Sequence, residues 1–186
     1  MKIKILEKTP GCMPMEFKVG DWIDVCTAED VALKGPHALH KHKKKDGSYV
    51  ERYRDVVFDT ALINLGFCMK LPKGYEAILA VRSSTPKKWG IMQLNSIGVI
   101  DNLYCGNNDE WKLAAIAYRD TKIPKGTRIA QLRIQLSQKA TLWQKLKWLF
   151  SSTIVFERVK SLEEESRGGF GEGTNNEKPT QSQTKN

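Results

Sequence analysis

"NSIGVIDNLYCG", residues 95–106, joins an apolar strand pattern to a carboxylate and an aromatic side chain. The run 98–100 favours a β-strand that delivers Asp101 at its end, and Tyr104 follows shortly after it. A β-hairpin with an aspartate in its turn is the common structural explanation. A general base beside an aromatic platform is the functional explanation, and the stretch alone leaves both open.

Short apolar stretches with alternating polarity recur on both sides of this segment, as is typical of β-strands. Turns containing Pro-Lys-Gly join them, of which "LPKGYEA" (71–77) and "IPKGTRI" (123–129) are the clearest. The chain of 186 residues has no internal repeat and favours a single domain. The sequence therefore predicts an all-β sandwich or barrel-like fold.

The balance of charge indicates an anionic partner. The formal net charge is +9, which suits a nucleic acid, a nucleotide or a membrane surface without choosing between them. The cysteines lack the Cys-x-x-Cys spacing of a zinc site, so we expect free thiols in a reducing compartment. No apolar run reaches membrane-spanning length and the N-terminus has no signal-peptide pattern. We therefore expect a cytoplasmic protein without a membrane partner.

Two segments interrupt the strand pattern. Residues 34–55 carry a lysine cluster and all the histidines without metal-ligand spacing, which predicts a flexible basic loop. Residues 141–152 predict a short helix that Thr141 caps and that has one apolar face. That face comprises Leu142, Leu146, Leu149 and Phe150. Its tryptophan and lysine content suggests a membrane surface, but the segment is short and packing against the body is favoured.

Two further segments carry groups suited to phosphate. "VRSSTPKKWG" (81–90) places an arginine and two serines in a turn that either binds phosphate oxygens or is simply polar. In "KGTRIAQLRI" (125–134), Gln131 interrupts the pattern of a buried strand. A buried glutamine needs hydrogen-bond partners, which are either structural groups or a ligand.

The last two segments lie near the ends of the chain. "GDWIDVCTAED" (20–30) places Asp24 within an apolar strand, where an unpaired carboxylate is costly, so we expect a hydrated metal ion or a neighbouring arginine beside it. "SRGGFGEGT" (166–174) has the composition of a flexible linker, yet it frames Phe170 with glycines and follows a cation. The polar residues 175–186 are expected to be disordered.

In order, these five segments resemble the five signature motifs of the homotrimeric dUTP diphosphatase (dUTPase) family, from Met1 to about Thr174. The resemblance implies an all-β fold of the β-clip or distorted jelly-roll type, with one short inserted helix near 141–152. It also implies a homotrimer with shared active sites at the subunit interfaces, and Mg²⁺-assisted hydrolysis of dUTP to dUMP and pyrophosphate. The implied parts are a β domain (1–165), a glycine-rich lid (166–174) and a tail (175–186).

The resemblance also implies roles for individual residues. Asp101 would activate the water that attacks the α-phosphate, and Tyr104 would lie against the deoxyribose and exclude a 2′-hydroxyl. Asp24 would reach Mg²⁺ through water. The implied uracil contacts come from Asn95, Val99, Ile100, Lys112 and Phe170. The implied phosphate contacts come from Arg82, Ser83, Ser84, Gln131, Arg167 and Gly171.

The chain departs from the family pattern in three places, one of which is Ser84 where the pattern has glycine, and leaves two rival functions open. "CGNNDEW" inserts residues 107–109 after Tyr104, and Glu172 replaces a hydroxyl residue in the lid. A dCTP deaminase, or a bifunctional deaminase-diphosphatase, is implied to share the fold, but the glycine-framed Phe170 favours a dUTPase. A non-catalytic nucleic-acid-binding module is the other alternative. Aromatic residues are sparse around the basic run 41–45, so nucleic acid is not expected as a partner.

Overall fold

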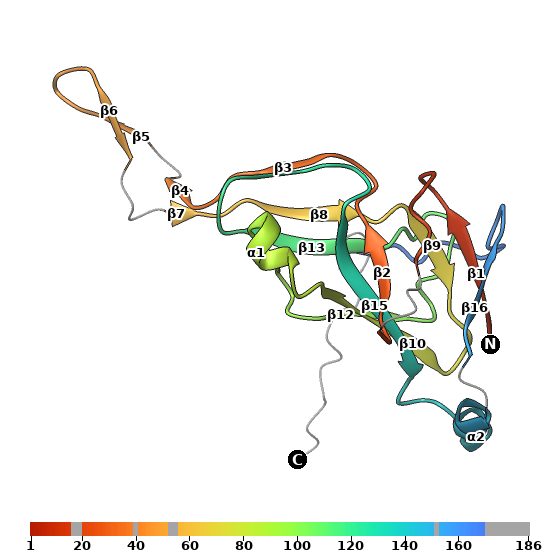
Figure 1. Cartoon of the computed structure of the whole chain (residues 1–186). Helices are drawn as coiled ribbons and strands as arrows, with labels where there is room; N and C mark the ends of the chain where they lie inside the picture. Colours follow the sequence, from red (N-terminus) through yellow and green to blue (C-terminus); the bar gives the residue numbers. More distant parts are fainter. Residues whose placement is uncertain (16–19, 39–40, 52–55, 151–152, 170–186) are drawn as a thin grey trace, which may run out of the picture.

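The computed structural model describes residues 1–15, 20–38, 41–51, 56–150 and 153–169, and β-strands dominate it (Figure 1). The strands are β1 (Lys2–Glu7), β2 (Ile23–Cys26), β3 (Val31–Leu33), β4 (His37–Ala38), β5 (Lys41–Lys43), β6 (Tyr49–Glu51), β7 (Val56–Val57), β8 (Thr60–Asn64), β9 (Phe67–Lys70), β10 (Tyr75–Val81), β11 (Ile91–Gln93), β12 (Gly98–Asp101), β13 (Lys112–Ala117), β14 (Thr121–Ile123), β15 (Arg128–Leu136) and β16 (Val155–Arg158). The helices are α1 (Thr85–Trp89) and α2 (Leu142–Phe150). The prediction of a mostly β fold is confirmed.

No helix in the described part of the chain has the length and apolar character needed to cross a membrane.

Three small sheets form the body. Their strand orders are β12-β10-β15-β2, β16-β1-β9 and β11-β13-β8. Only the β1–β16 pair is parallel among the described ladders. β12 stands at the edge of its sheet, where Asp101 lies opposite Glu76 of β10. The residue that the sequence singled out is therefore delivered to a sheet edge, where a ligand has access to it.

Alternating burial along the strands builds the core. In β13 the buried positions are Leu113, Ala115 and Ala117, and the intervening side chains are half-buried. Strands that bury every second side chain on one face gain most of their stability from the apolar area removed from water. The largest core side chain, Trp111, packs on Phe67 with ring centroids 5.3 Å apart. Trp111 lies two residues after the insertion at 107–109, so the core holds the chain close to one end of that insertion.

The polar turn predicted after β10 is partly a helix. Pro86 in the first turn of α1 has the backbone dihedral that a helix start needs, and Gly90 ends the helix in the left-handed region with φ 64°. Thr85 is buried and its hydroxyl donates to the Ile129 carbonyl (2.7 Å). Only Ser83 and Ser84 therefore remain as exposed turn hydroxyls in this segment.

The flexible basic loop predicted at 34–55 contains regular structure, so that prediction is wrong for its described part. β4 pairs with β7 and β5 with β6, and Figure 1 shows the β5–β6 hairpin projecting from the body. Asp46 accepts a hydrogen bond from the Ser48 N–H (2.9 Å), and Gly47 takes a positive φ of 86°. An Asp-Gly pair is a strong hairpin signal, and here it lies next to a run of lysines whose composition is typical of a loop.

The helix predicted at 141–152 is present as α2, and Thr141 Oγ1 accepts from the Gln144 N–H (3.3 Å) as a cap. The prediction that its apolar face packs against the body is wrong. Leu142, Leu146, Leu149 and Phe150 are all exposed. The helix is instead held by Trp148, whose ring centroid lies 5.6 Å from that of Tyr75, and by Gln144, which donates to the Lys73 carbonyl (2.6 Å).

Candidate active site

Asp101 occupies a defined position at the end of β12. The Leu103 N–H donates to Asp101 Oδ1 (2.9 Å), and the Tyr104 N–H donates to the Asp101 carbonyl (3.3 Å). This side-chain-to-backbone turn is typical of aspartate after a strand. The turn holds the carboxylate while leaving about half of the side chain exposed (47%). A fixed and accessible carboxylate is suited to accept a proton.

Arg167 is the charged partner that lowers the pKa of Asp101. Its Nη1 lies 2.7 Å from Asp101 Oδ2. Burial alone would raise the pKa of Asp101, but the Arg167 guanidinium and the Leu103 N–H outweigh it and hold the pKa below its usual range. The carboxylate is therefore in its basic form at neutral pH.

A cavity of about 230 Å³ lies against this pair. Its walls are Val99, Ile100, Asp101, Tyr104, Arg167, Gly168 and Gly169. The Tyr104 hydroxyl donates to the Glu110 carbonyl (2.9 Å), which fixes the ring. A Cβ atom on Gly169 would lie 3.0 Å from Tyr104 Cε2, so a glycine lets the backbone pass close to the ring. The structure thus brings together two segments that are far apart in the sequence. One is the strand and turn at 98–104, and the other is the start of the glycine-rich segment.

Asp109 anchors the glycine-rich segment to this cavity. Its side chain is buried and accepts from three backbone N–H groups, those of Gly106 (2.8 Å), Arg167 (3.0 Å) and Gly168 (3.3 Å). A buried carboxylate is tolerated where such donors compensate its lost hydration. A Cβ on Gly106 would meet Ser166 Cα at 2.4 Å, so the two backbones touch here. Asp109 therefore fixes the backbone from which the Arg167 side chain reaches Asp101.

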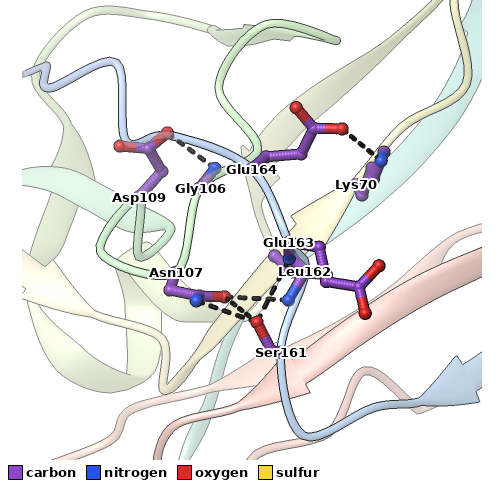
Figure 2. Close-up of polar contacts among 8 residues, drawn as sticks. All are labelled: Lys70, Gly106, Asn107, Asp109, Ser161, Leu162, Glu163 and Glu164. Carbon is purple, nitrogen blue, oxygen red and sulfur yellow. Dashed lines mark hydrogen bonds and ion pairs between the residues drawn. The ribbon is translucent and has the colours of Figure 1, made fainter.

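Asn107 secures the chain just before that point (Figure 2). Its Oδ1 accepts from the Leu162 N–H (2.8 Å), and its Nδ2 donates to Ser161 Oγ (3.0 Å). Lys70 forms an ion pair with Glu164 beside these contacts. Residues 107–109 thus hold the segment 161–168 at several points. Sequence reasoning noted this insertion but assigned it no function, although its polar Asn-Asn-Asp composition was the available signal.

A second cluster forms around Asp24. The Asp24 carboxylate is buried, with Oδ1 3.0 Å from Arg82 Nε and Oδ2 3.2 Å from Arg128 Nη1. Gln131 lies opposite Asp24 in the β2–β15 ladder. The neighbouring arginine that the sequence left as an alternative to a metal ion is therefore present. None of these residues lines the cavity beside Asp101.

The remaining predicted residues are spread over several places. Val99 and Ile100 line the cavity, whereas Asn95 is exposed in the turn between β11 and β12. Lys112 begins β13, where it lies opposite Asn64 of β8, and it is not part of the cavity wall. Ser83 and Ser84 lie between β10 and α1, outside that wall. Phe170 and Gly171 lie outside the described residues.

An accessible carboxylate at the rim of a cavity, beside an aromatic ring and an arginine on a glycine-rich segment, is an arrangement suited to hydrolysis of an anionic substrate. The dUTPase family model matches residues 50–149. The chain is 44% identical over 140 residues to the SPbeta prophage-derived deoxyuridine 5'-triphosphate nucleotidohydrolase YosS of Bacillus subtilis, which covers 75% of this chain and 82% of that protein. The chain belongs to the dUTPase family.

Other comparisons agree on the family and on the fold. A deoxyuridine 5'-triphosphate nucleotidohydrolase of Helicobacter pylori (strain P12) is 29% identical over 178 residues, covering 94% of this chain and 96% of that protein. The crystal structure of dUTPase from Streptococcus mutans superposes with a TM-score of 0.57 at 18% identity, over 76% of this chain and 99% of that one. The dUTPase from phage phi11 of S. aureus gives a TM-score of 0.54 at 18% identity, over 75% of this chain and 93% of that one. These structural neighbours confirm the expected dUTPase fold.

Proposed function

We propose that this chain hydrolyses dUTP to dUMP and pyrophosphate at the cavity beside Asp101, with Asp101 as the general base. dUTP hydrolysis follows from membership of the dUTPase family. The observation that carries the assignment of the base is the Asp101 carboxylate itself, which is fixed by the Leu103 N–H and kept ionised by Arg167 at the rim of the cavity.

In the proposed step, a water molecule gives a proton to the Asp101 carboxylate while its oxygen forms a bond to the α-phosphorus. The bond from that phosphorus to the bridging oxygen breaks, and pyrophosphate leaves with the bonding electron pair. A positioned base contributes roughly 10²–10⁴-fold in rate. On substrate binding, Arg167 would exchange Asp101 for the γ-phosphate, since guanidinium groups bind both anions through charge-assisted hydrogen bonds. That exchange would free the base to accept the proton.

Recognition of the nucleoside would fall to the apolar and aromatic walls. Tyr104 would lie against the deoxyribose and leave no room for a 2′-hydroxyl, while the backbone of β12 at Val99 and Ile100 would pair with the uracil edge. β12 is an edge strand whose outer side is open to such pairing. A mispaired polar group in the cavity costs about 1–3 kcal/mol, which is enough to reject cytosine.

A homotrimer with shared sites is part of the proposal. The predicted phosphate-binding residues Arg82, Ser83, Ser84 and Gln131 do not line the cavity of their own chain, so the proposal places them against a neighbouring copy's cavity. The segment around β11 and β12 exposes several large apolar side chains suited to an interface between copies. They are Met92, Leu94, Ile97, Val99 and Leu103.

Magnesium enters the proposal as the ion that accompanies the substrate's phosphates. Mg²⁺ at such sites keeps several waters and is held largely by phosphate oxygens. Asp24 would reach the ion only through water, because both of its carboxylate oxygens pair with guanidinium groups. When bound, the ion would neutralise phosphate charge.

We also propose a cytoplasmic location, because the cysteines are present as free thiols. Cys12, Cys26, Cys68 and Cys105 are all free in the described part of the chain. Burial raises the pKa of Cys12 and of Cys68 to about 12 each, so both stay as unreactive thiols. Such unpaired cysteines are usual in a reducing compartment.

The test of the function is a nucleotide panel assayed with Mg²⁺ for pyrophosphate and for ammonia. We expect pyrophosphate from dUTP and from no other common nucleoside triphosphate. A deaminase needs a free glutamate beyond Asp101 to activate water. Glu110 is the glutamate nearest to that place in the sequence, but its side chain accepts a hydrogen bond from the Gly66 N–H (2.9 Å), which disfavours this role. Release of ammonia from dCTP would overturn the proposal.

The Asp101–Arg167 pair predicts a pH effect. In an Arg167→Gln variant the pKa of Asp101 should rise, because burial then acts without the guanidinium that opposes it. The active carboxylate is lost as pH falls through this pKa, so the acid limb of the kcat/KM profile should move to higher pH. The profile is measured on dUTP, with Arg158→Gln, which breaks the distant Arg158–Glu7 pair, as the control. An acid limb that stays in place would contradict the assignment.

A further inference from the structure

Helix α2 turns its apolar face away from the protein. The exposed fractions are 70% for Leu142, 80% for Trp143, 37% for Leu146, 74% for Leu149 and 83% for Phe150. No residue of α2 is buried, and Figure 1 shows the helix at the margin of the molecule. Large apolar side chains gathered in this way on a surface mark a site of interaction.

Helix geometry explains why the apolar residues point outward. Successive residues are rotated by about 100°, so Gln144 and Trp148 lie on one side of the helix. These two residues make the contacts with the body, to the Lys73 carbonyl and to the Tyr75 ring. The five apolar residues occupy the opposite side. Gln144 and Trp148 thus dock the helix by its more polar side and present the other side to the surroundings.

The borders of this apolar face are positively charged. Lys145 and Lys147 lie on either side of it by the same helical geometry. Lys139 precedes the helix, and Lys73 belongs to the turn against which the helix docks. The sequence from 137 to 153 contains no aspartate or glutamate. The face therefore combines leucine, tryptophan and phenylalanine with a rim of lysines, in a segment that carries no acidic residue.

We propose that α2 docks the enzyme onto an anionic lipid surface. An amphipathic helix with aromatic and leucine residues on one face and lysines beside them lies in the plane of a membrane interface, with its lysines at the anionic headgroups. A second copy of α2 suits this face less well, because pairing two such helices would bring their lysine borders together without an acidic partner. A nucleic acid would satisfy the lysines but not the apolar face.

This surface is separate from the Asp101 cavity, since no residue of α2 lines that cavity. A helix of this length gives weak and reversible attachment, which both the apolar area and the charge strengthen. Raising the salt concentration should weaken it, because screening acts on the lysine contribution.

The experiment is sedimentation of the full chain with vesicles that mix phosphatidylcholine and phosphatidylglycerol in equal parts, at low ionic strength. We expect the wild-type chain to sediment with these vesicles and to bind pure phosphatidylcholine less. The Trp143→Glu/Leu149→Glu variant should lose binding by roughly tenfold or more, since both changes place charge on the apolar face. Its rate of dUTP hydrolysis should be unchanged.

Two controls separate the alternatives. The Lys44→Gln/Lys45→Gln variant removes two positive charges from the β5–β6 hairpin. The Lys145→Gln/Lys147→Gln variant removes two positive charges from α2, and only this variant should weaken vesicle binding. Light scattering of the wild-type chain and of the Trp143→Glu/Leu149→Glu variant should give the same mass. Failure of the wild-type chain to bind vesicles, equal effects of the two lysine variants, or a smaller mass for the glutamate variant would each overturn the proposal. The smaller mass would assign the face to contacts between copies.

Discussion

Asp101→Asn is expected to abolish nearly all pyrophosphate release from dUTP while dUTP binding survives. Asparagine has the shape of aspartate and can still accept the hydrogen bond from the Leu103 N–H that holds the native carboxylate (2.9 Å). What it loses is the ability to take a proton from water. A positioned general base contributes roughly 10²–10⁴-fold, so kcat should fall by about that factor.

The measurement is kcat from pyrophosphate release together with calorimetric binding of a non-hydrolysable dUTP analogue. Asp46→Asn is the matched control, because Asp46 is an exposed carboxylate at the turn of the β5–β6 hairpin. Loss of the charge on Asp101 also removes the ion pair with Arg167, which frees that guanidinium for phosphate. Binding should therefore be unchanged or tighter. Near-normal turnover by Asp101→Asn would show that another group is the base.

The local features of this fold could be predicted because they depend on neighbours in the sequence. The apolar run 98–100 predicted the strand that carries Asp101, and the Thr141 cap predicted the start of α2. The direction of the α2 apolar face could not be predicted in the same way. It depends on which side of the helix meets Tyr75, a contact that forms only in the folded chain. Periodicity identifies the face of a helix but not what covers it.

The surroundings of the candidate site depended on distant residues and were harder to predict. One of the two arginines that pair with Asp24 is Arg128, which lies 104 positions away along the chain. The sequence showed only that a buried carboxylate needs a partner. The anchoring role of Asp109 was missed for the same reason, since its acceptor oxygens meet N–H groups of the chain nearly sixty residues later. The sequence of an insertion does not show which distant part of the fold its side chains contact.

Asp109→Ala should lower kcat/KM for dUTP and move the acid limb of its pH profile upward. The change leaves the N–H groups of Gly106, Arg167 and Gly168 without their acceptor, and an unmet buried donor costs about 1–3 kcal/mol. The backbone at Arg167 should then separate from the cavity wall. Asp101 would lose the guanidinium that lowers its pKa, so the active carboxylate would be lost at higher pH.

The pH profile distinguishes positioning of Arg167 from general loss of stability. A variant that only unfolds more easily loses activity without moving the acid limb, whereas Asp109→Ala and Arg167→Gln should move it by similar amounts. Combining the two changes should move it little further, because both act through the same ion pair. Asn107→Ala is the matched control, since the Asn107 side chain bonds to Ser161 and Leu162, whereas Asp109 bonds to the backbone of Arg167 and Gly168. A full additive shift in the double variant would show that Asp109 does not act through Arg167.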